Sequence, residues 1–279
     1  MKTQYKTAFD YIRSKTREKC EVGIILGTGL GGLVKHITKS CSIDYKDIPN
    51  FPVSTVESHT GTLIFGKLSG RNIVAMQGRF HYYEGYSHDR IVFPVHILKL
   101  LGVKYIIVSN ACGAINPKLR KTDLVIMSSH INLHFSSPLI SSAGMNGGHG
   151  PGGISKSTSA KKAQYFYDKD LIELAEQTAL ENKIDIKKGT YASVQGPNLE
   201  TKAEYSMLKV LAADVVGMST IPEVLTAKEL GIRTFGLSIV TDEGFPDTLK
   251  VAELKHILES AAIAEPNMVL LIKKLVSKL

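Results

Sequence analysis

The order of the apolar segments limits the fold of this chain more than any other feature of its sequence. Short apolar runs, such as VGIIL at 22–26 and KYIIVS at 104–109, alternate with longer stretches of helical spacing. A buried strand reads as a short apolar run, and alternating strand and helix patterns are typical of α/β domains. The alternation predicts an α/β fold with a mixed central β-sheet flanked by helices on both sides.

The mixture of strand directions follows from one local pattern. Apolar runs at 63–68 and 72–77 flank the turn SGR, which favours an antiparallel hairpin over a helical crossover. Other expected strands are 123–127, 190–194, 214–217 and 233–241, and the expected helices are 90–101, 170–182, 222–230 and one from about 249. No internal repeat or change in composition interrupts the pattern, so residues 1–279 are expected to form a single domain.

Composition excludes several classes of protein. With 43% hydrophobic and 22% charged residues, the 279-residue chain can bury a full core without disulfides or a metal. No apolar run approaches the roughly 20 residues of a membrane span, and the start lacks the apolar block of a secretory signal. We therefore expect a cytoplasmic location and no membrane partner.

The cysteines and the net charge do not indicate a particular function. Cys20, Cys41 and Cys112 lack a CxxC spacing, so we expect free thiols and no metal site. The formal charge of +8 comes from scattered lysines, which favours a solvated basic surface over a nucleic-acid partner. A basic nucleic-acid binding protein stays an alternative, and steep salt dependence of binding would reveal it.

A glycine-rich turn follows the first predicted strand. GTGLGG at 27–32 fits the G-x-G-x-x-G pattern of dinucleotide sites. The segment that should supply the second strand and its acidic end, SCSIDYKDIPNFP, is short, polar and broken by prolines. The glycines and the Thr28 hydroxyl can instead hold a phosphate on exposed N–H groups. A Rossmann-type oxidoreductase is the alternative that depends on this motif alone.

Arg79 and His81 lie two residues apart directly after a predicted strand, in GRFHYYEGY. Residues i and i+2 of an extended segment point to the same side, so both can converge on one group of ligand oxygens. An Arg fork and a His donor suit a phosphate.

Further candidates lie where predicted strands end, which is where open α/β sheets bind ligands. SNACGAINPKL at 109–119 offers backbone N–H groups, while Cys112 within it has no evident base partner and is expected to be a packed thiol. GPNLET, GMSTIPE and VTDEG each carry a group able to contact a heterocycle or sugar: Glu200, Met218, Ser219 and Asp242.

Taken together, these segments resemble the low-mass trimeric purine nucleoside phosphorylases, a family that includes the methylthioadenosine phosphorylases. The matching blocks are GTGLGGL, STVESHTG, GRFHYYEGY, SNACGAINP, SSHINL, VQGPNLET and DVVGMSTIPEV, and the likeness runs from about residue 22 to about 275. It implies phosphorolysis of purine ribo- and deoxyribonucleosides to free base and pentose 1-phosphate, with 6-oxopurines favoured. It also implies a homotrimer that uses inorganic phosphate as co-substrate and needs no metal or organic cofactor.

The resemblance also assigns roles to individual residues. Phosphate binding is implied for Thr28, His59, Arg79, His81, the backbone of Ala111, and Ser219, with His59 also near the ribose. Nucleoside binding is implied for Tyr83, Asn110, Ala111, Leu199, Glu200, Met218, Asp242 and His256. The residues implied in catalysis are His81, Glu200 and Asp242. Cleavage builds positive charge on the sugar and negative charge on the purine, so an anion and a donor are both required.

Several positions differ from the family pattern. Asp242 stands where members that prefer 6-oxopurines usually have asparagine, and an ionised aspartate cannot donate a hydrogen bond. Glu200 matches the 6-oxopurine pattern, in which a carboxylate accepts from N1–H. We therefore expect inosine and guanosine to be favoured, and we hypothesise that Asp242 extends the range to adenosine-type substrates.

The residues that would contact the base and the 5′ group of the sugar also differ from the family pattern. Leu199 replaces an aromatic residue that usually stacks on the base. The group facing the 5′ position is His256 in an ungapped alignment and Leu254 if a short gap is allowed. Leu254 would favour 5′-deoxy or alkylthio nucleosides, so a methylthioadenosine or methylthioinosine phosphorylase is the main alternative. The segment 134–160 is rich in Ser and Gly and is expected to be a lid or linker.

Overall fold

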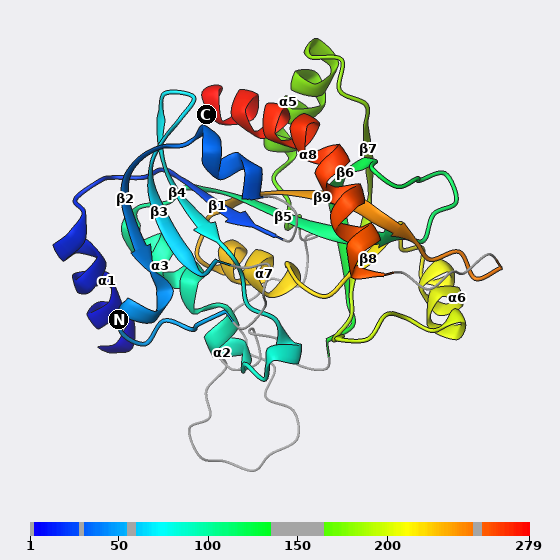
Figure 1. Cartoon of the computed structure of the whole chain (residues 1–279), viewed down its shortest axis with the longest axis horizontal. Helices are drawn as coiled ribbons and strands as arrows, with labels where there is room; N and C mark the ends of the chain where they lie inside the picture. Colours follow the sequence, from blue (N-terminus) through cyan, green and yellow to red (C-terminus); the bar gives the residue numbers. More distant parts are fainter. Residues whose placement is uncertain (1–2, 28–30, 55–59, 135–164, 248–252) are drawn as a thin grey trace.

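One sheet organises the molecule. The structure, a computed structural model, describes residues 3–27, 31–54, 60–134, 165–247 and 253–279. Its sheet has nine strands in the order β2-β3-β4-β1-β5-β8-β7-β6-β9, and β9 also pairs with β5 (Figure 1). The strands are β1 Val22–Leu26, β2 Thr38–Asp44, β3 Thr62–Leu68, β4 Arg71–Gln77, β5 Tyr105–Ala114, β6 Leu124–Asn132, β7 Ile186–Ser193, β8 Val215–Gly217 and β9 Arg233–Glu243.

The sheet is mixed, as the sequence predicts. β1 runs parallel to β4 and β5, and β5 runs parallel to β9 along its whole length. β3 and β4 form the expected antiparallel hairpin, and β6 pairs antiparallel with β9. Since β9 pairs with both β5 and β6, the strands from β5 to β9 close upon themselves. The ends of β5, β8 and β9 are thereby brought together.

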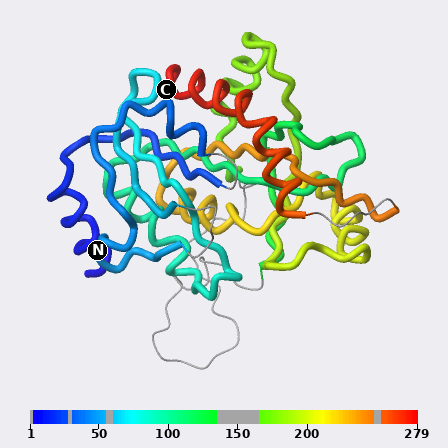
Figure 2. The backbone as a smooth tube through the Cα atoms, in the orientation of Figure 1, coloured from blue at the N-terminus to red at the C-terminus, as the bar shows by residue number. Residues whose placement is uncertain are grey.

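Helices cover both sides of this sheet. They are α1 Thr3–Lys15, α2 His88–Ile91, α3 Phe93–Leu101, α5 Lys169–Glu181, α6 Lys202–Val210, α7 Ile221–Glu229 and α8 Leu254–Ser277. α5 and α8 lie on one side, and α1, α3 and α7 lie on the other (Figure 1). α8 crosses the sheet from the side of β8 and α6 to the side of the β3–β4 hairpin (Figure 2), so its first residues reach the ends of β8 and β9. None of the described helices combines the length and the apolar composition that a membrane crossing requires.

The predicted helix 90–101 is in fact two helices, because Pro94 interrupts the hydrogen-bond ladder. Proline has no N–H to donate, so it is tolerated in the first turn of a helix and not in its interior. α3 begins with this proline in its first turn, and α2 ends before Val92. Gly102, at φ 101°, ends α3 in the left-handed conformation, as predicted.

Two strands differ from the expectation. β5 continues beyond residue 109 to Ala114, because β9 pairs with it throughout, with a shift of one residue in the register between Cys112 and Gly113. β2 lies at the edge of the sheet with most of its side chains exposed, which explains why its sequence is too polar to indicate a strand. Apart from His134, the Ser- and Gly-rich segment 134–160 lies outside the described residues.

Candidate functional site

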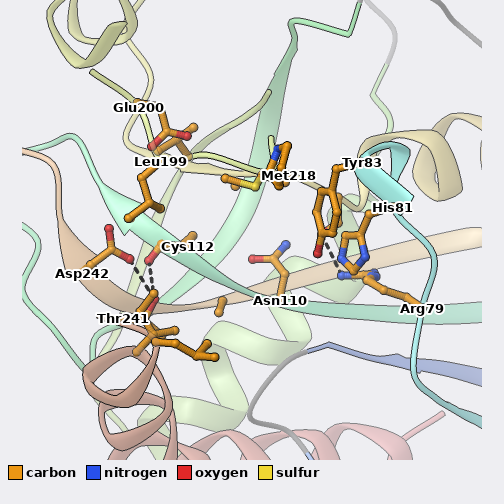
Figure 3. A pocket seen from close by; sticks show the side chains of 18 residues that line it. Arg79, His81, Tyr83, Asn110, Cys112, Leu199, Glu200, Met218, Thr241 and Asp242 are labelled. Carbon is orange, nitrogen blue, oxygen red and sulfur yellow. Dashed lines mark hydrogen bonds between the residues drawn. The ribbon is translucent and has the colours of Figure 1, made fainter. Parts of the chain in front are cut away.

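A cavity of about 240 Å³ opens where the strands end, between β5, β8, β9 and the start of α8 (Figure 3). Its lining includes most of the residues singled out in the sequence: Arg79, His81, Tyr83, Asn110, Ala111, Leu199, Glu200, Met218, Ser219 and Asp242. These residues come from segments far apart in the chain. Parallel strands that end at the same edge of the sheet bring them into one place.

One described candidate residue does not line this cavity, and two others are not described by the structure. Thr28 and His59 lie outside the described residues. His256 is exposed on α8, and the α8 residues that line the cavity are Leu254 and Ile257. Of the two alternatives for the 5′ group, the structure therefore places Leu254 at the cavity.

Sequence reasoning missed several lining residues. Gly113, Val216, Thr241 and Ile257 also line the cavity. Extending the strand pattern of β5 past residue 109 would have found Gly113, but Val216 and Ile257 carry no local signal. Cys112 lines the cavity as well; it is 3% exposed, and burial raises the pKa of its thiol well above the usual value. It is the packed thiol that was expected.

Arg79 is buried at one end of the cavity, with 1% of its surface exposed. Its Nε lies 3.2 Å from Glu223 Oε1 on α7, forming a buried ion pair. Its NH1 group donates to the Ser109 carbonyl at 2.8 Å and to Ser219 Oγ at 3.0 Å. A buried cation is tolerated when it is paired and hydrogen-bonded, so this network fixes the guanidinium at the cavity wall.

His81 lies at the same end and is also held by a carboxylate. Glu84 Oε1 is 2.9 Å from His81 Nδ1, and it also accepts from the His81 backbone N–H at 2.9 Å. Because an ionised carboxylate only accepts, this contact assigns a hydrogen to Nδ1. The His81 ring stacks on Tyr83 with their centroids 4.7 Å apart. Together these contacts set the plane of the imidazole ring.

Two carboxyl groups, Glu200 and Asp242, lie at the opposite end (Figure 3). Each is 8% exposed, and neither forms an ion pair with a described residue. Burial raises the pKa of both groups, and the charge of Asp242 raises that of Glu200 further. Thr241 Oγ1 lies 3.0 Å from Asp242 Oδ1 and 3.2 Å from the Cys112 carbonyl.

Two glycines make room for this arrangement. A Cβ added at Gly113 would lie 2.8 Å from Asp242 Oδ2, closer than real contacts allow. Gly196 has φ +70°, and a Cβ there would lie 2.3 Å from Met218 Sδ. The absence of side chains at these positions lets Asp242 and Met218 lie against the backbone.

Other possible sites are less well formed. A cavity of about 410 Å³ at the opposite edge of the sheet is lined mainly by exposed side chains, among them Lys19, Lys67 and Arg71. Within the described part of the chain, no group of three or more His, Cys, Asp or Glu side chains could hold a metal ion. The cavity with Arg79 and Asp242 is therefore the best candidate for a site of chemistry.

Comparison with known proteins relates this chain to a family of enzymes. The sequence model of the Phosphorylase superfamily matches residues 21–277. Purine nucleoside phosphorylase 1 of Bacillus subtilis is 43% identical over 242 residues, which cover 87% of this chain and 86% of the relative. The purine nucleoside phosphorylase of Rattus norvegicus is 39% identical over 268 residues, covering 95% and 91% of the two chains.

Solved structures of related enzymes have the same fold as this chain. The purine nucleoside phosphorylase of Schistosoma mansoni in complex with inosine superimposes with a TM-score of 0.86 at 39% identity, over 99% of this chain and 96% of that one. Its complex with adenosine gives a TM-score of 0.85 at the same identity and coverage.

Proposed function

The chain belongs to the phosphorylase superfamily and, within it, to the purine nucleoside phosphorylases, and we propose that its cavity binds phosphate at the Arg79 end and the purine at the Glu200 end. In the reaction, a phosphate oxygen attacks the anomeric carbon of the nucleoside and the bond to the purine breaks. The products are a pentose 1-phosphate and the free base. The observation that carries the assignment is the separation of a fixed cation and two buried carboxyl groups at opposite ends of one cavity.

Phosphate is suited to the Arg79 end. The guanidinium of Arg79, the imidazole of His81 and the hydroxyl of Ser219 supply the positive charge and the donors that a phosphate needs. The Ala111 backbone, implied by the family resemblance, lines the same cavity. Positive charge develops on the sugar as its bond to the base breaks, and a phosphate dianion held close to it stabilises the transition state.

The purine end must neutralise the negative charge of the departing base. A 6-oxopurine presents N1–H, from which an ionised Glu200 accepts, and N7, which needs a donor. Asp242 can be that donor when it is protonated, and burial favours the neutral form by raising its pKa. The Thr241 hydroxyl can donate to Asp242 Oδ1 at 3.0 Å, which leaves the single hydrogen of a protonated Asp242, on Oδ2, for N7 of the purine.

Asp242 also gives the site a way to bind 6-aminopurines. When it is ionised, its carboxylate accepts hydrogen bonds, and a 6-amino group is a donor. We therefore propose inosine and guanosine as the preferred substrates and adenosine as a weaker one.

A second candidate activity is phosphorolysis of 5′-methylthio nucleosides. The α8 residues that line the cavity, Leu254 and Ile257, are both apolar, whereas His256 is exposed outside it. An apolar wall favours an alkylthio group over a hydroxyl at the 5′ position.

One panel of assays tests these proposals together. Phosphate-dependent release of purine is measured side by side for inosine, guanosine, adenosine and methylthioadenosine. We expect inosine and guanosine to react fastest, and Asp242→Asn to lower the rate of adenosine relative to inosine, because an amide can donate to N7 but no longer carries a charge that accepts. Asp185→Asn, at an exposed carboxylate paired with Lys187, is the matched control. An unchanged ratio in Asp242→Asn would remove the proposed role of Asp242.

The remaining properties are proposed from the sequence pattern and from the family resemblance. They are a single domain over residues 1–279, a homotrimer, a cytoplasmic location, no cofactor besides the phosphate co-substrate, and no nucleic-acid or membrane partner. Light scattering on the purified protein measures the number of subunits. Activity that survives dialysis against a chelator supports the absence of a metal.

A further inference from the structure

Thr220, which follows the cavity-lining Ser219, has an unusual backbone conformation. It has φ 74° and ψ −48°, a region that β-branched residues rarely adopt, and none of its surface is exposed. It precedes α7, but its side chain makes no capping hydrogen bond to that helix. Helix capping therefore does not account for the strained conformation.

The Thr220 hydroxyl instead joins three side chains that line the cavity. Arg79 NH1 lies 3.1 Å from Thr220 Oγ1, and Asn110 Nδ2 lies 2.8 Å from the same atom. Ser219 Oγ is 3.2 Å away. With this strained backbone turn, two consecutive hydroxyls, Ser219 and Thr220, face the same guanidinium.

The directions of these hydrogen bonds follow from the donors and acceptors available. A hydroxyl has one hydrogen and two lone pairs, and guanidinium and amide N–H groups only donate. Arg79 NH1 has two hydrogens for three acceptors, so it donates one to the Ser109 carbonyl and shares the other between Ser219 Oγ and Thr220 Oγ1. Thr220 Oγ1 also accepts from Asn110, so the Thr220 hydrogen is donated to Ser219 Oγ. The Ser219 hydrogen is thus left for an acceptor in the cavity.

The backbone of Ser219 is fixed independently of these contacts. Tyr191 Oη and Ser193 Oγ donate to the Ser219 carbonyl at 3.3 and 3.1 Å. Because strained conformations persist only where the surroundings determine them, this second layer of hydrogen bonds explains how Thr220 is held.

We propose that Thr220 is a positioning residue for the anion end of the cavity: it orients the Ser219 hydroxyl as a donor and fixes Arg79 and Asn110 around it. The inference depends on the proposed binding of phosphate by Arg79 and Ser219. Thr220 itself need not touch the phosphate. A donor that is already oriented binds an oxyanion without the cost of reorganisation.

The test uses the full-length enzyme with Thr220→Val, which keeps the shape of the side chain and removes its hydroxyl. We expect the KM for phosphate to rise about tenfold, the effect of weakening one hydrogen bond to a charged group, while the KM for inosine changes less than about twofold. Thr220→Ser, which keeps the hydroxyl, should restore most of the phosphate affinity.

A matched control is available in α7. Thr226 is buried, and its hydroxyl has no hydrogen-bond partner among the described residues, so Thr226→Val makes the same chemical change outside the cavity. It should leave both KM values unchanged. If Thr220→Val lowers only the melting temperature, or raises the two KM values equally, Thr220 is structural and the inference is wrong.

Ser219→Ala separates this inference from the function it depends on. If Ser219→Ala leaves the KM for phosphate unchanged, the proposed phosphate site is wrong. If Ser219→Ala raises that KM and Thr220→Val does not, only the role of Thr220 is wrong. If Thr220 acts through Ser219, Thr220→Val should have a smaller effect in the Ser219→Ala background than alone.

Discussion

At the anion end of the cavity, Arg79 and His81 each contact a buried carboxylate, Glu223 and Glu84 respectively. At the purine end, Glu200 and Asp242 form no ion pair with a basic side chain among the described residues, and burial raises the pKa of both. The first end is a network of hydrogen bonds that holds the Arg79 guanidinium and the His81 ring in place. The second is a pair of groups whose charge depends on pH and on the bound ligand.

The difference matches the two tasks of a nucleoside phosphorylase. Phosphate is the same in every turnover, so a rigid site built around the Arg79 guanidinium suits it. Purine bases differ in which ring atoms donate and accept, and the base gains charge during the reaction. A carboxyl group that can exist in either protonation state suits that end. Changes at the anion end should therefore affect all substrates alike, and changes at the purine end should alter selectivity.

The largest effect is expected from Arg79→Gln. Removing one partner of a buried, hydrogen-bonded ion pair costs about 3–5 kcal/mol, and it leaves Glu223 buried without its cation. We expect kcat/KM for phosphate to fall on the order of 1000-fold with every nucleoside tested. Steady-state kinetics, with circular dichroism to check folding, measures this.

Arg233→Gln is the control for that variant. Arg233 forms ion pairs with Asp168 and Asp170 and does not line the cavity, so its replacement can lower stability without removing a phosphate contact. It should keep nearly full activity. A loss smaller than tenfold in Arg79→Gln, or a loss with only one nucleoside, would contradict a common anion site.

Glu200→Gln should have the second-largest effect and a different pattern. Replacing the carboxylate weakens a charge-assisted hydrogen bond to N1–H, so kcat/KM for inosine should fall on the order of 100-fold. The KM for phosphate should hardly change. Glu204→Gln provides the comparison, since Glu204 caps α6 on the surface and should affect stability only. Equal effects on phosphate and inosine would mean that the two ends do not act separately.

Asp242→Asn should change how stability depends on pH. Burial raises the pKa of Asp242 in the folded state. The protein is therefore most stable with respect to this group below the unfolded pKa of about 4, where Asp242 is neutral in both states. It loses stability as pH rises through the pKa of Asp242 in the folded state. An asparagine does not ionise. The variant should therefore melt a few degrees above wild type at pH 8 and close to it at pH 4. Thermal melts in the absence of ligands measure this, and a constant difference across pH would show that Asp242 does not titrate there.

The smallest effect is expected at Leu254, which lines the cavity but is 64% exposed. Leu254→Ala should raise the KM for methylthioadenosine about threefold, because only part of an apolar side chain is removed from contact. His256→Ala should change no KM value. If His256→Ala instead raises the KM for inosine, the residue facing the 5′ hydroxyl is His256 and not Leu254.

The sequence alone predicted the α/β class, the β3–β4 hairpin and the strands whose ends carry the site residues. These features depend on neighbouring residues, because apolar runs and turns have local signatures. The same locality explains why Arg79 and His81 were found, since two residues on an extended segment point the same way.

Contacts between distant segments were decided by the tertiary structure. Glu223 lies 144 positions from Arg79, and no local pattern marks it as the partner of that cation. β5 extends past residue 109 because β9 pairs with it, and the phase of α8 places Leu254 rather than His256 at the cavity. The strained turn at Thr220 also needs the packed surroundings that hold it. Sequence determines which groups are present near strand ends, whereas packing determines which of them meet, because the energy of a buried contact depends on both partners.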